Sequence, residues 1–249
     1  MIPKIERHIV LGGVCNLRDL GGYPVEDGNS TRWRQILRSD SLHDLNDSGI
    51  DALIEAGLVS VVDLRDASEL ERQPNPFHAH RAVNYSHIPL FAHLDLKEHL
   101  ASMAGVDDIL LGLYCEVLTQ RRPALSEALA AIADAAPGAV LFHCTVGKDR
   151  TGILAALVLA AVGVSSDAIV ADYALSAARI ARIRERMLAE FSAGGADVNT
   201  FLPLFSSEPS TMRGMLDFLE NTYGSVDAYL HILDPERILR QKLQARMLC

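Results

Sequence analysis

The sequence predicts an α/β fold with a central, mostly parallel sheet flanked by helices. Apolar, β-branched runs alternate with helical stretches along the first 150 residues, and this alternation is typical of a parallel sheet covered by helices. The run at 138–143 (GAVLFH) is almost wholly apolar, as expected for a central strand buried on both faces. No linker divides the 249 residues, so we expect a single domain over 1–249.

Three further strands are expected before the central one. They lie at 32–40 (RWRQILRSD), 58–65 (LVSVVDLR) and 82–90 (AVNYSHIPL). Such runs favour strands because β-branched and aromatic side chains pack well on a pleated surface. Pro89 ends the third run, since proline cannot donate a hydrogen bond to a sheet ladder.

A helix is predicted between the first two of these strands. It runs from Asn46 to Ala56, with Asn46 or Asp47 as its N-cap and Gly57 at its C-terminal end. Short polar side chains at the start can accept a hydrogen bond from the first free amides. Glycine suits the end because it adopts the left-handed conformation without strain.

More helices are expected after the second strand. Ser68 and Glu71 have the spacing of a capping box, which predicts a short helix there. Two longer helices, near 106–120 and 124–135, are separated by Pro123.

The chain beyond Thr151 is predicted to be helical, and one part of it breaks the α/β pattern. Within 176–222, a helix (SAARIARIRERMLAEF) is followed by a polar turn (SAGGADVNTFLPLFSSEPS) and a second helix (TMRGMLDFLENTYG). Two peripheral helices and a helical insertion that covers the active site as a lid both fit this pattern.

Composition excludes several classes of function. A net charge of −9 argues against a general nucleic-acid binder. No apolar stretch reaches the roughly 18 residues of a spanning helix, so stable membrane insertion is not expected. The N-terminus, MIPKIERHIVLGG, carries charges where a signal peptide would be apolar. We therefore expect a cytoplasmic protein, and secretion by a route without a cleaved signal is also compatible.

The most informative segment is the turn HCTVGKDRT between the 138–143 strand and the helix that follows. Backbone amides in such a turn can surround an anion, and the helix N-terminus adds its positive dipole. Cys144 lies at the base of this turn, where the thiolate form is favoured. Arg150 can bind two phosphate oxygens with its planar guanidinium. Gly147 allows a tight bend, Thr151 can donate to the sulfur, and His143 can brace the loop.

These residues predict a thiolate nucleophile below a bound phosphate. A buried structural cysteine beside a charged helix cap is the simpler explanation of a lone cysteine, but it does not explain the whole pattern. The predicted anion-binding groups are the side chains and amides of Thr145, Val146, Gly147, Lys148, Asp149 and Arg150.

The segment HCTVGKDRTG resembles the signature loop of the cysteine-dependent protein tyrosine phosphatase superfamily, HCxxGxxR[ST]. Its Lys148-Asp149 pair is similar to a bacterial and fungal branch that includes a secreted mycobacterial tyrosine and lipid phosphatase. Other segments resemble the same branch: NLRDLGGY, LRSDSL, VVDLRDASEL, IVADYALS and TYGSVDAYL. The resemblance and the alanine-rich composition suggest a bacterial source. The resemblance also implies a tyrosine phosphatase fold and hydrolysis of phosphate monoesters through a cysteinyl phosphate, without metal or cofactor.

The sequence departs from the best-known eukaryotic tyrosine phosphatases in one respect. Their Trp-Pro-Asp loop supplies the general acid, whereas the single tryptophan here, Trp33, lies in RWRQ. Two aspartates are nearly equal candidates for the acid: Asp149 within the loop, and Asp63 at the end of a predicted strand. A structural pairing with Arg65 or Arg18 is the alternative for Asp63. Asp66, a predicted helix cap, is a weaker third candidate.

Two basic residues bear on the substrate. Lys148 would favour substrates with a second phosphate, or it is a solvated lysine in the first helical turn. For the Arg-Asp pair in NLRDLGGY, a buried structural salt bridge is the favoured explanation. In the family this segment lies near the active site, so the alternative is that Arg18 helps to orient the loop or the substrate. Phosphotyrosine proteins are the first expected substrates, and phosphoinositides or dual specificity are the alternative.

Other classes of protein also carry some of these residue patterns. Arsenate reductases and sulfurtransferases also use a cysteine in an anion-binding loop, and an inactive phospho-binding module is an alternative outside the enzymes. The histidines at positions 78, 80, 87 and 93 are close in sequence, but they do not form a convincing metal cluster.

Overall fold

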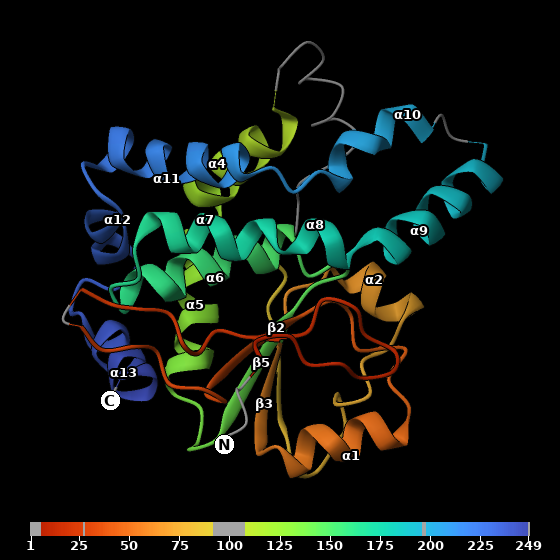
Figure 1. The fold of residues 1–249 in the computed structure, drawn as a ribbon, viewed down its shortest axis with the longest axis horizontal. Coiled ribbons are helices and arrows are strands. Elements are labelled where there is room, and N and C mark those ends of the chain that lie inside the picture. Colours follow the sequence, from red (N-terminus) through yellow and green to blue (C-terminus); the bar gives the residue numbers. More distant parts are fainter. Residues whose placement is uncertain (1–5, 27, 92–107, 196–197, 249) are drawn as a thin grey trace.

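The central sheet has five strands in the order β1-β2-β5-β3-β4, and only β1 is antiparallel to its neighbour. The computed structural model describes residues 6–26, 28–91, 108–195 and 198–248. The strands are β1 (Arg18–Asp19), β2 (Ile36–Ser39), β3 (Leu58–Asp63), β4 (Asn84–His87) and β5 (Ala139–His143). The predicted α/β class with a mostly parallel sheet is therefore confirmed, and the GAVLFH run forms the central strand (Figure 1).

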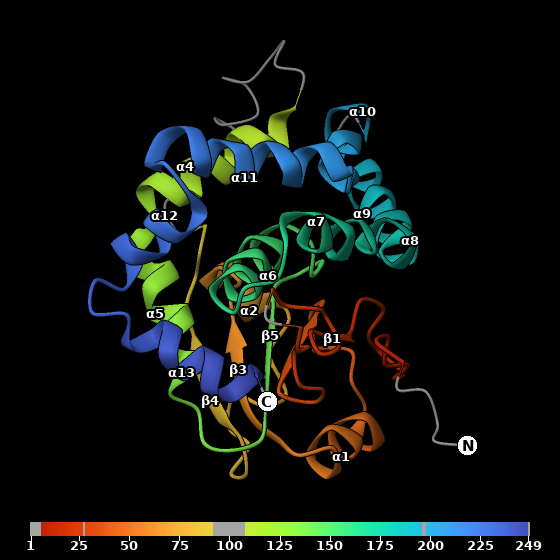
Figure 2. The same ribbon diagram turned by 60° about the vertical axis from the view of Figure 1, so that its left-hand side comes forward.

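Helices cover both faces of the sheet (Figures 1 and 2). α1 packs on one face, and α4 to α7 and α11 to α13 form a thicker layer on the other. The helical segments are α1 (Asp47–Glu55), α2 (Ala67–Arg72), α4 (Ile109–Gln120), α5 (Arg122–Ala133), α6 (Asp149–Ala161), α7 (Ser166–Ala174), α8 (Ser176–Arg179), α9 (Ala181–Ala193), α10 (Val198–Phe201), the 3-10 helix η1 (Leu202–Phe205), α11 (Pro209–Tyr223), α12 (Val226–Leu233) and α13 (Ile238–Met247).

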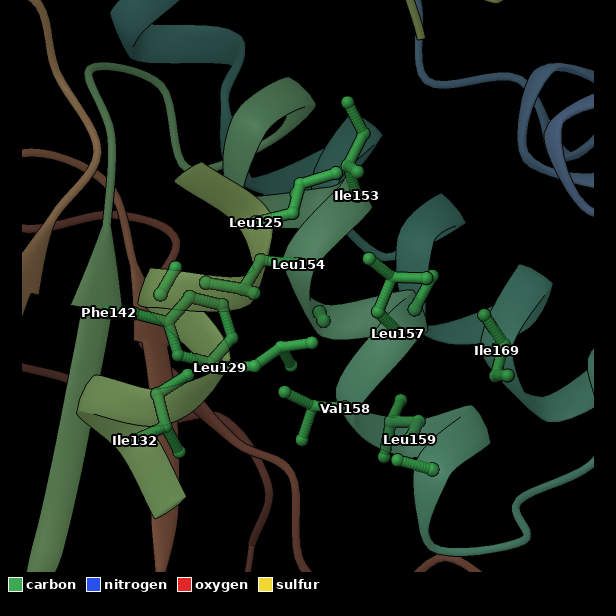
Figure 3. Close-up of a cluster of buried hydrophobic side chains, with 14 of the residues drawn as sticks. Leu125, Leu129, Ile132, Phe142, Ile153, Leu154, Leu157, Val158, Leu159 and Ile169 are labelled. Atoms are coloured by element: carbon green, nitrogen blue, oxygen red, sulfur yellow. The ribbon is translucent and has the colours of Figure 1, made fainter. Parts of the chain in front are cut away.

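The packing of β5 on both faces explains why its sequence is apolar. Val140 and Phe142 point into the core on the side of α5 and α6, whereas Ala139 and Leu141 point into the smaller core beneath α1. Because successive strand residues face opposite sides, a strand covered on both faces must be apolar at every position. Figure 3 shows Phe142 packed with side chains of α5 and α6. The charged turn that follows is thereby fixed at the carboxyl edge of a rigid strand.

The ends of α1 and α2 test the predicted caps. Asn46 accepts a hydrogen bond from the amide of Gly49 at 3.0 Å, as predicted for α1. The Ser68–Glu71 capping box is wrong, because α2 begins after Asp66, whose backbone amide donates to Glu69 at 2.8 Å. This shift of register places Glu69 on the side of the active-site loop.

The 176–222 segment divides into two parts with different packing. Its C-terminal helix, α11, buries Met212, Met215, Leu216 and Leu219 in the main core against α4 and α7. α9 buries a single side chain, Ile183, and extends away from the sheet (Figure 1). We call the described part of the stretch from α9 to Ser206 (181–195 and 198–206) the α9–η1 segment, and a lid over the site stays a prediction. No described helix is long and apolar enough to cross a membrane.

Candidate active site

The site lies where β5 ends and α6 begins, at the carboxyl edge of the parallel strands. Cys144 follows β5 directly, and its side chain is buried. Gly147 has a positive φ of 70°, and a Cβ there would lie 2.5 Å from backbone atoms of Ser39 and Asp40. Only glycine fits this bend, as the sequence predicted. The turn is thus packed tightly against the end of β2.

The loop is held from behind by hydrogen bonds that side chains donate to its carbonyl groups. Asn16 donates through Nδ2 to the carbonyls of Val146 (3.2 Å) and Gly147 (3.0 Å), and Arg38 donates to the carbonyl of Gly147 at 2.8 Å. In a trans peptide the following N–H points the opposite way. The loop amides therefore face the other side, and those from Thr145 to Lys148 donate to no group in the described chain. Unbonded amides that face one side are what an anion nest needs, and the anion-binding role of the loop stays a prediction.

A buried charge network supports these donors. Asp172 binds Arg18 at 3.0 Å and Arg38 at 2.6 Å, and it accepts from the hydroxyl of Tyr23 at 2.8 Å. Although burial opposes it, the two guanidinium groups hold the pKa of Asp172 well below its usual range. Burial lowers the pKa of Arg38 to about 10, so Arg38 stays charged at neutral pH. Two positive charges against one negative charge leave a net positive charge behind the anion nest.

Arg18 therefore lies in a buried salt bridge, and its contact with the loop is indirect. Its Nη1 donates to Oδ1 of Asn16 at 2.6 Å, and this fixes the amide whose Nδ2 holds the loop. It does not pair with Asp63, which was one alternative for that aspartate.

The guanidinium of Arg150 is bound by a carboxylate of the same chain. Its Nη1 lies 2.5 Å from Oε2 of Glu69 and its Nη2 lies 2.9 Å from Oε1, and the hydroxyl of Thr145 also donates to Glu69. Although burial opposes it, the hydrogen bonds from Arg150 lower the pKa of Glu69 to about 2. Glu69 thus presents an anion to two groups that were predicted to bind phosphate. The ring of Phe91 lies 4.9 Å from the same guanidinium.

Asp63 is fully buried and surrounded by donors. It accepts from Arg65 at 2.7 Å, from Tyr85 at 3.0 Å and from Asn75 at 3.1 Å, and Nε2 of His143 lies 3.4 Å away. Although burial opposes it, the charges of His143 and Arg65 hold the pKa of Asp63 far below its usual range. This is the structural pairing with Arg65, and it leaves no proton to donate at neutral pH.

Asp149 points toward the helical layer. Its Oδ1 accepts from the hydroxyl of Tyr114 at 2.6 Å and lies 3.1 Å from Nζ of Lys148. The Tyr114 hydroxyl is also 2.8 Å from that of Tyr173. The carboxylate is 19 % exposed, and its position at the start of α6 stabilises the negative charge.

Asp66 lies beside Arg150, whereas Asp149 lies beside Tyr114 and Lys148. Its Oδ2 lies 3.9 Å from Nη1 of Arg150, and its buried Oδ1 has no hydrogen-bond partner in the described chain. Burial raises the pKa of Asp66, whereas neighbouring charges depress that of Asp63. Asp66 is therefore a half-buried carboxyl group beside Arg150 that binds a proton more readily than a free aspartate.

Lys148 is not solvated. Its side chain has no exposed surface, and Nζ donates to the carbonyls of Leu204 at 2.6 Å and Ser206 at 2.5 Å. The ammonium group joins the catalytic loop to the α9–η1 segment. In this structure it points at these carbonyls, so contact with a second substrate phosphate would require it to turn.

His143 and Thr151, the two residues predicted to support the loop, differ in whether their side chains make hydrogen bonds. His143 has Nδ1 3.1 Å from the carbonyl of Cys144 and Nε2 2.8 Å from Nδ2 of Asn75, which is the bracing role predicted for it. The buried hydroxyl of Thr151 makes no hydrogen bond to any described group, so its predicted bond to the Cys144 sulfur is not formed here.

Sequence reasoning did not assign several residues that this site depends on. Asn16, Arg38 and Asp172 lie in segments that carry the family resemblance, but their contacts join positions up to 160 residues apart. Glu69 was missed because the register of α2 was misplaced. Among the described residues no group of three or more His, Cys, Asp or Glu side chains could hold a metal ion. One of the weighed histidines, His93, lies outside the described residues.

Comparison with known proteins agrees with this geometry. The sequence profile of the tyrosine phosphatase family matches residues 9–249. A Cupriavidus necator protein, named as a candidate tyrosine-protein phosphatase, is 31% identical over 87% of this chain and 80% of its own. The triple specificity protein phosphatase PtpB of Mycobacterium tuberculosis is 29% identical over 88% of this chain and 91% of its own. A Nostoc commune tyrosine-protein phosphatase is 37% identical over 57% of this chain and 48% of its own. The chain belongs to the tyrosine phosphatase family.

Proposed function

We propose that this protein hydrolyses phosphotyrosine in protein substrates, with Cys144 as the nucleophile. The observation that carries the proposal is the arrangement around Cys144: free loop amides from Thr145 to Lys148 on one side and the guanidinium of Arg150 beside them. Such a nest stabilises both the thiolate and the charge that spreads over the phosphoryl oxygens during transfer.

The reaction has two steps. The thiolate of Cys144 attacks phosphorus, the S–P bond forms, and the P–O bond to tyrosine breaks as an acid protonates the phenolic oxygen. Water then attacks the cysteinyl phosphate, the former acid takes the proton from the water, and the thiolate and inorganic phosphate are released. Arg150 holds two phosphoryl oxygens in both steps, after it has exchanged Glu69 for the substrate.

We assign the acid role to Asp66, with Asp149 as the alternative. Asp66 combines a pKa raised by burial with a position 3.9 Å from Arg150, so a carboxyl group that binds a proton more readily than a free aspartate lies beside the proposed phosphate site. Asp149 is hydrogen-bonded to Tyr114 on the helical side of α6. Asp63 has no exposed surface and is paired with Arg65, which argues against a role as the acid.

The first experiment measures phosphate release with a chelator present. The substrates are a phosphotyrosine peptide, a phosphothreonine peptide and a monophosphorylated phosphoinositide, with Cys144→Ser as the control. We expect turnover dominated by phosphotyrosine and abolished in the control. Lipid turnover that equals peptide turnover would assign a broader specificity, as the name of the mycobacterial relative has it for that protein. No turnover, with stoichiometric binding of phosphopeptide, would show a phospho-binding module instead.

A further inference from the structure

A second cavity lies beside the catalytic loop, on the side of the N-terminal segment. Its volume is about 520 Å³, and it is lined by the loop of residues 10–15, the turn of residues 40–44 and α9. Thr145, which follows the nucleophile in the chain, forms one end of the cavity. A substrate whose phosphate occupies the catalytic loop therefore has this cavity next to it.

The charges of the cavity are unevenly matched. Asp44 is paired with Arg186 at 2.8 Å and with Nε2 of His43 at 3.2 Å. Asp40 is buried and accepts from the backbone amides of Cys15 and Asn16. Its carboxylate is thus held by the chain and does not face a ligand as a free charge.

Arg182 is the charge that remains unmatched. It is exposed, it lines the cavity, and it makes no hydrogen bond or ion pair with any described group. Arg182 and Arg186 both line the cavity together with Cys15. The lining carries two aspartates and two arginines, and Arg182 is the one of these four that is exposed and has no partner among the described residues, so it is placed to pair with one carboxylate of a ligand.

The remaining lining mixes apolar and polar groups. Val10 is 81% exposed and Ile183 is buried beside Arg182 on α9, whereas Ser41 and Thr145 contribute hydroxyl groups. A mixed lining with one unpaired guanidinium next to the catalytic loop fits a peptide better than a multiply phosphorylated headgroup, which would need several unpaired cations.

We propose that this cavity binds the peptide that flanks the phosphotyrosine, with Arg182 pairing with an Asp or Glu side chain of that peptide. The proposal rests on the proposed function, because it concerns the substrate of the same site. It makes Arg182 a specificity-determining residue outside the catalytic loop.

The test compares Arg182→Gln with the unchanged protein and with Arg184→Gln. Arg184 is an exposed arginine on the same helix that does not line the cavity, so it is a matched control. Each protein is given a phosphotyrosine peptide with flanking Asp and Glu, the same peptide with Asn and Gln, and p-nitrophenyl phosphate. We expect the unchanged protein to prefer the acidic peptide in kcat/KM by about two- to fivefold, the range of a single accessible ion pair. Arg182→Gln should remove this preference and leave p-nitrophenyl phosphate hydrolysis unchanged, and Arg184→Gln should keep the preference.

Two further arms separate the outcomes. Binding of both peptides to Cys144→Ser, measured by calorimetry with and without Arg182→Gln, tests the cavity even if no peptide is turned over. Hydrolysis of p-nitrophenyl phosphate without discrimination between the peptides would overturn the subsite and leave the phosphatase function standing. Loss of phosphoinositide turnover in Arg182→Gln, with equal turnover of both peptides, would assign the cavity to a lipid headgroup and likewise overturn the proposal.

Discussion

The assignment of the general acid gives the sharpest prediction. Replacing Asp66 by Asn keeps the shape of the side chain and removes its proton. We expect kcat/KM for a phosphotyrosine peptide to fall by about 10²- to 10³-fold, within the range measured for general acids. The side chain is 36 % exposed and its ion pair with Arg150 is long, at 3.9 Å, so the free energy of unfolding should change by less than about 1 kcal/mol.

Replacing Asp63 by Asn should mainly lower the stability of the protein and have less effect on its activity. Asp63→Asn places an amide among donors from Arg65, Asn75 and Tyr85, and it leaves the buried guanidinium without its counter-charge. Breaking a buried pair in this way costs about 3–5 kcal/mol. At roughly 2–4 °C per kcal/mol for a chain of this size, Tm should fall by about 10 °C. Residual activity per folded molecule should fall far less than in Asp66→Asn.

The assay uses two leaving groups and a pH series. An aryl phosphate with an acidic phenol needs no proton to depart, so the loss in Asp66→Asn should nearly disappear with that substrate. With the peptide, activity should fall as the pH rises through the pKa of Asp66, because the acid must be protonated, and this limb should be absent in the variant. Equal losses with both leaving groups would refute the assignment, and a leaving-group-dependent loss in Asp149→Asn would transfer the role to Asp149.

Three other predictions follow from the same contacts. Lys148→Met removes the donor to the carbonyls of Leu204 and Ser206, and each hydrogen bond from a charged group contributes about 1.5–3 kcal/mol. Peroxide should then inactivate Cys144 about tenfold faster. An unchanged rate of inactivation would show that the α9–η1 segment does not shield Cys144. Glu69→Gln weakens the competitor for Arg150, so inorganic phosphate should inhibit at a severalfold lower concentration, as measured by competition kinetics. Gly147→Ala places a Cβ 2.5 Å from the backbone at the end of β2, so both activity and thermal stability should fall.

The sequence was sufficient for the parts of the fold that depend on local pattern. The apolar run before Cys144 was identified as the central strand, and Asn46 was identified as one of two caps, because both signals lie within a few residues. The weak signal of the two-residue strand β1 was not identified, since its pairing with β2 depends on residues about 20 positions away. Local chemistry thus predicted β5, α1 and the catalytic loop, but not β1.

The site was predicted only in its contiguous part. Cys144 and Arg150 lie six positions apart, and the local pattern around them indicated an anion-binding turn. The ranking of the aspartates could not be obtained in this way, because the side chain of a strand residue changes face with a one-residue change of register. Asp63 lies beside Arg65 and His143, and Asp66 lies beside Arg150, only because β3 ends where it does.

The exchange of Glu69 for substrate explains how a buried arginine can remain available for catalysis. An unpaired guanidinium at 8% exposure would be costly, so the free protein satisfies Arg150 with a carboxylate. That carboxylate reaches Arg150 and Thr145, and it makes no bond to the amides of the inner loop. A phosphate carries one more oxygen and a second negative charge, so it can bind Arg150 and the amides together. The net positive charge of Arg18, Arg38 and Asp172 behind the loop favours the more highly charged ligand, so we expect the phosphate of the substrate to displace Glu69 from Arg150.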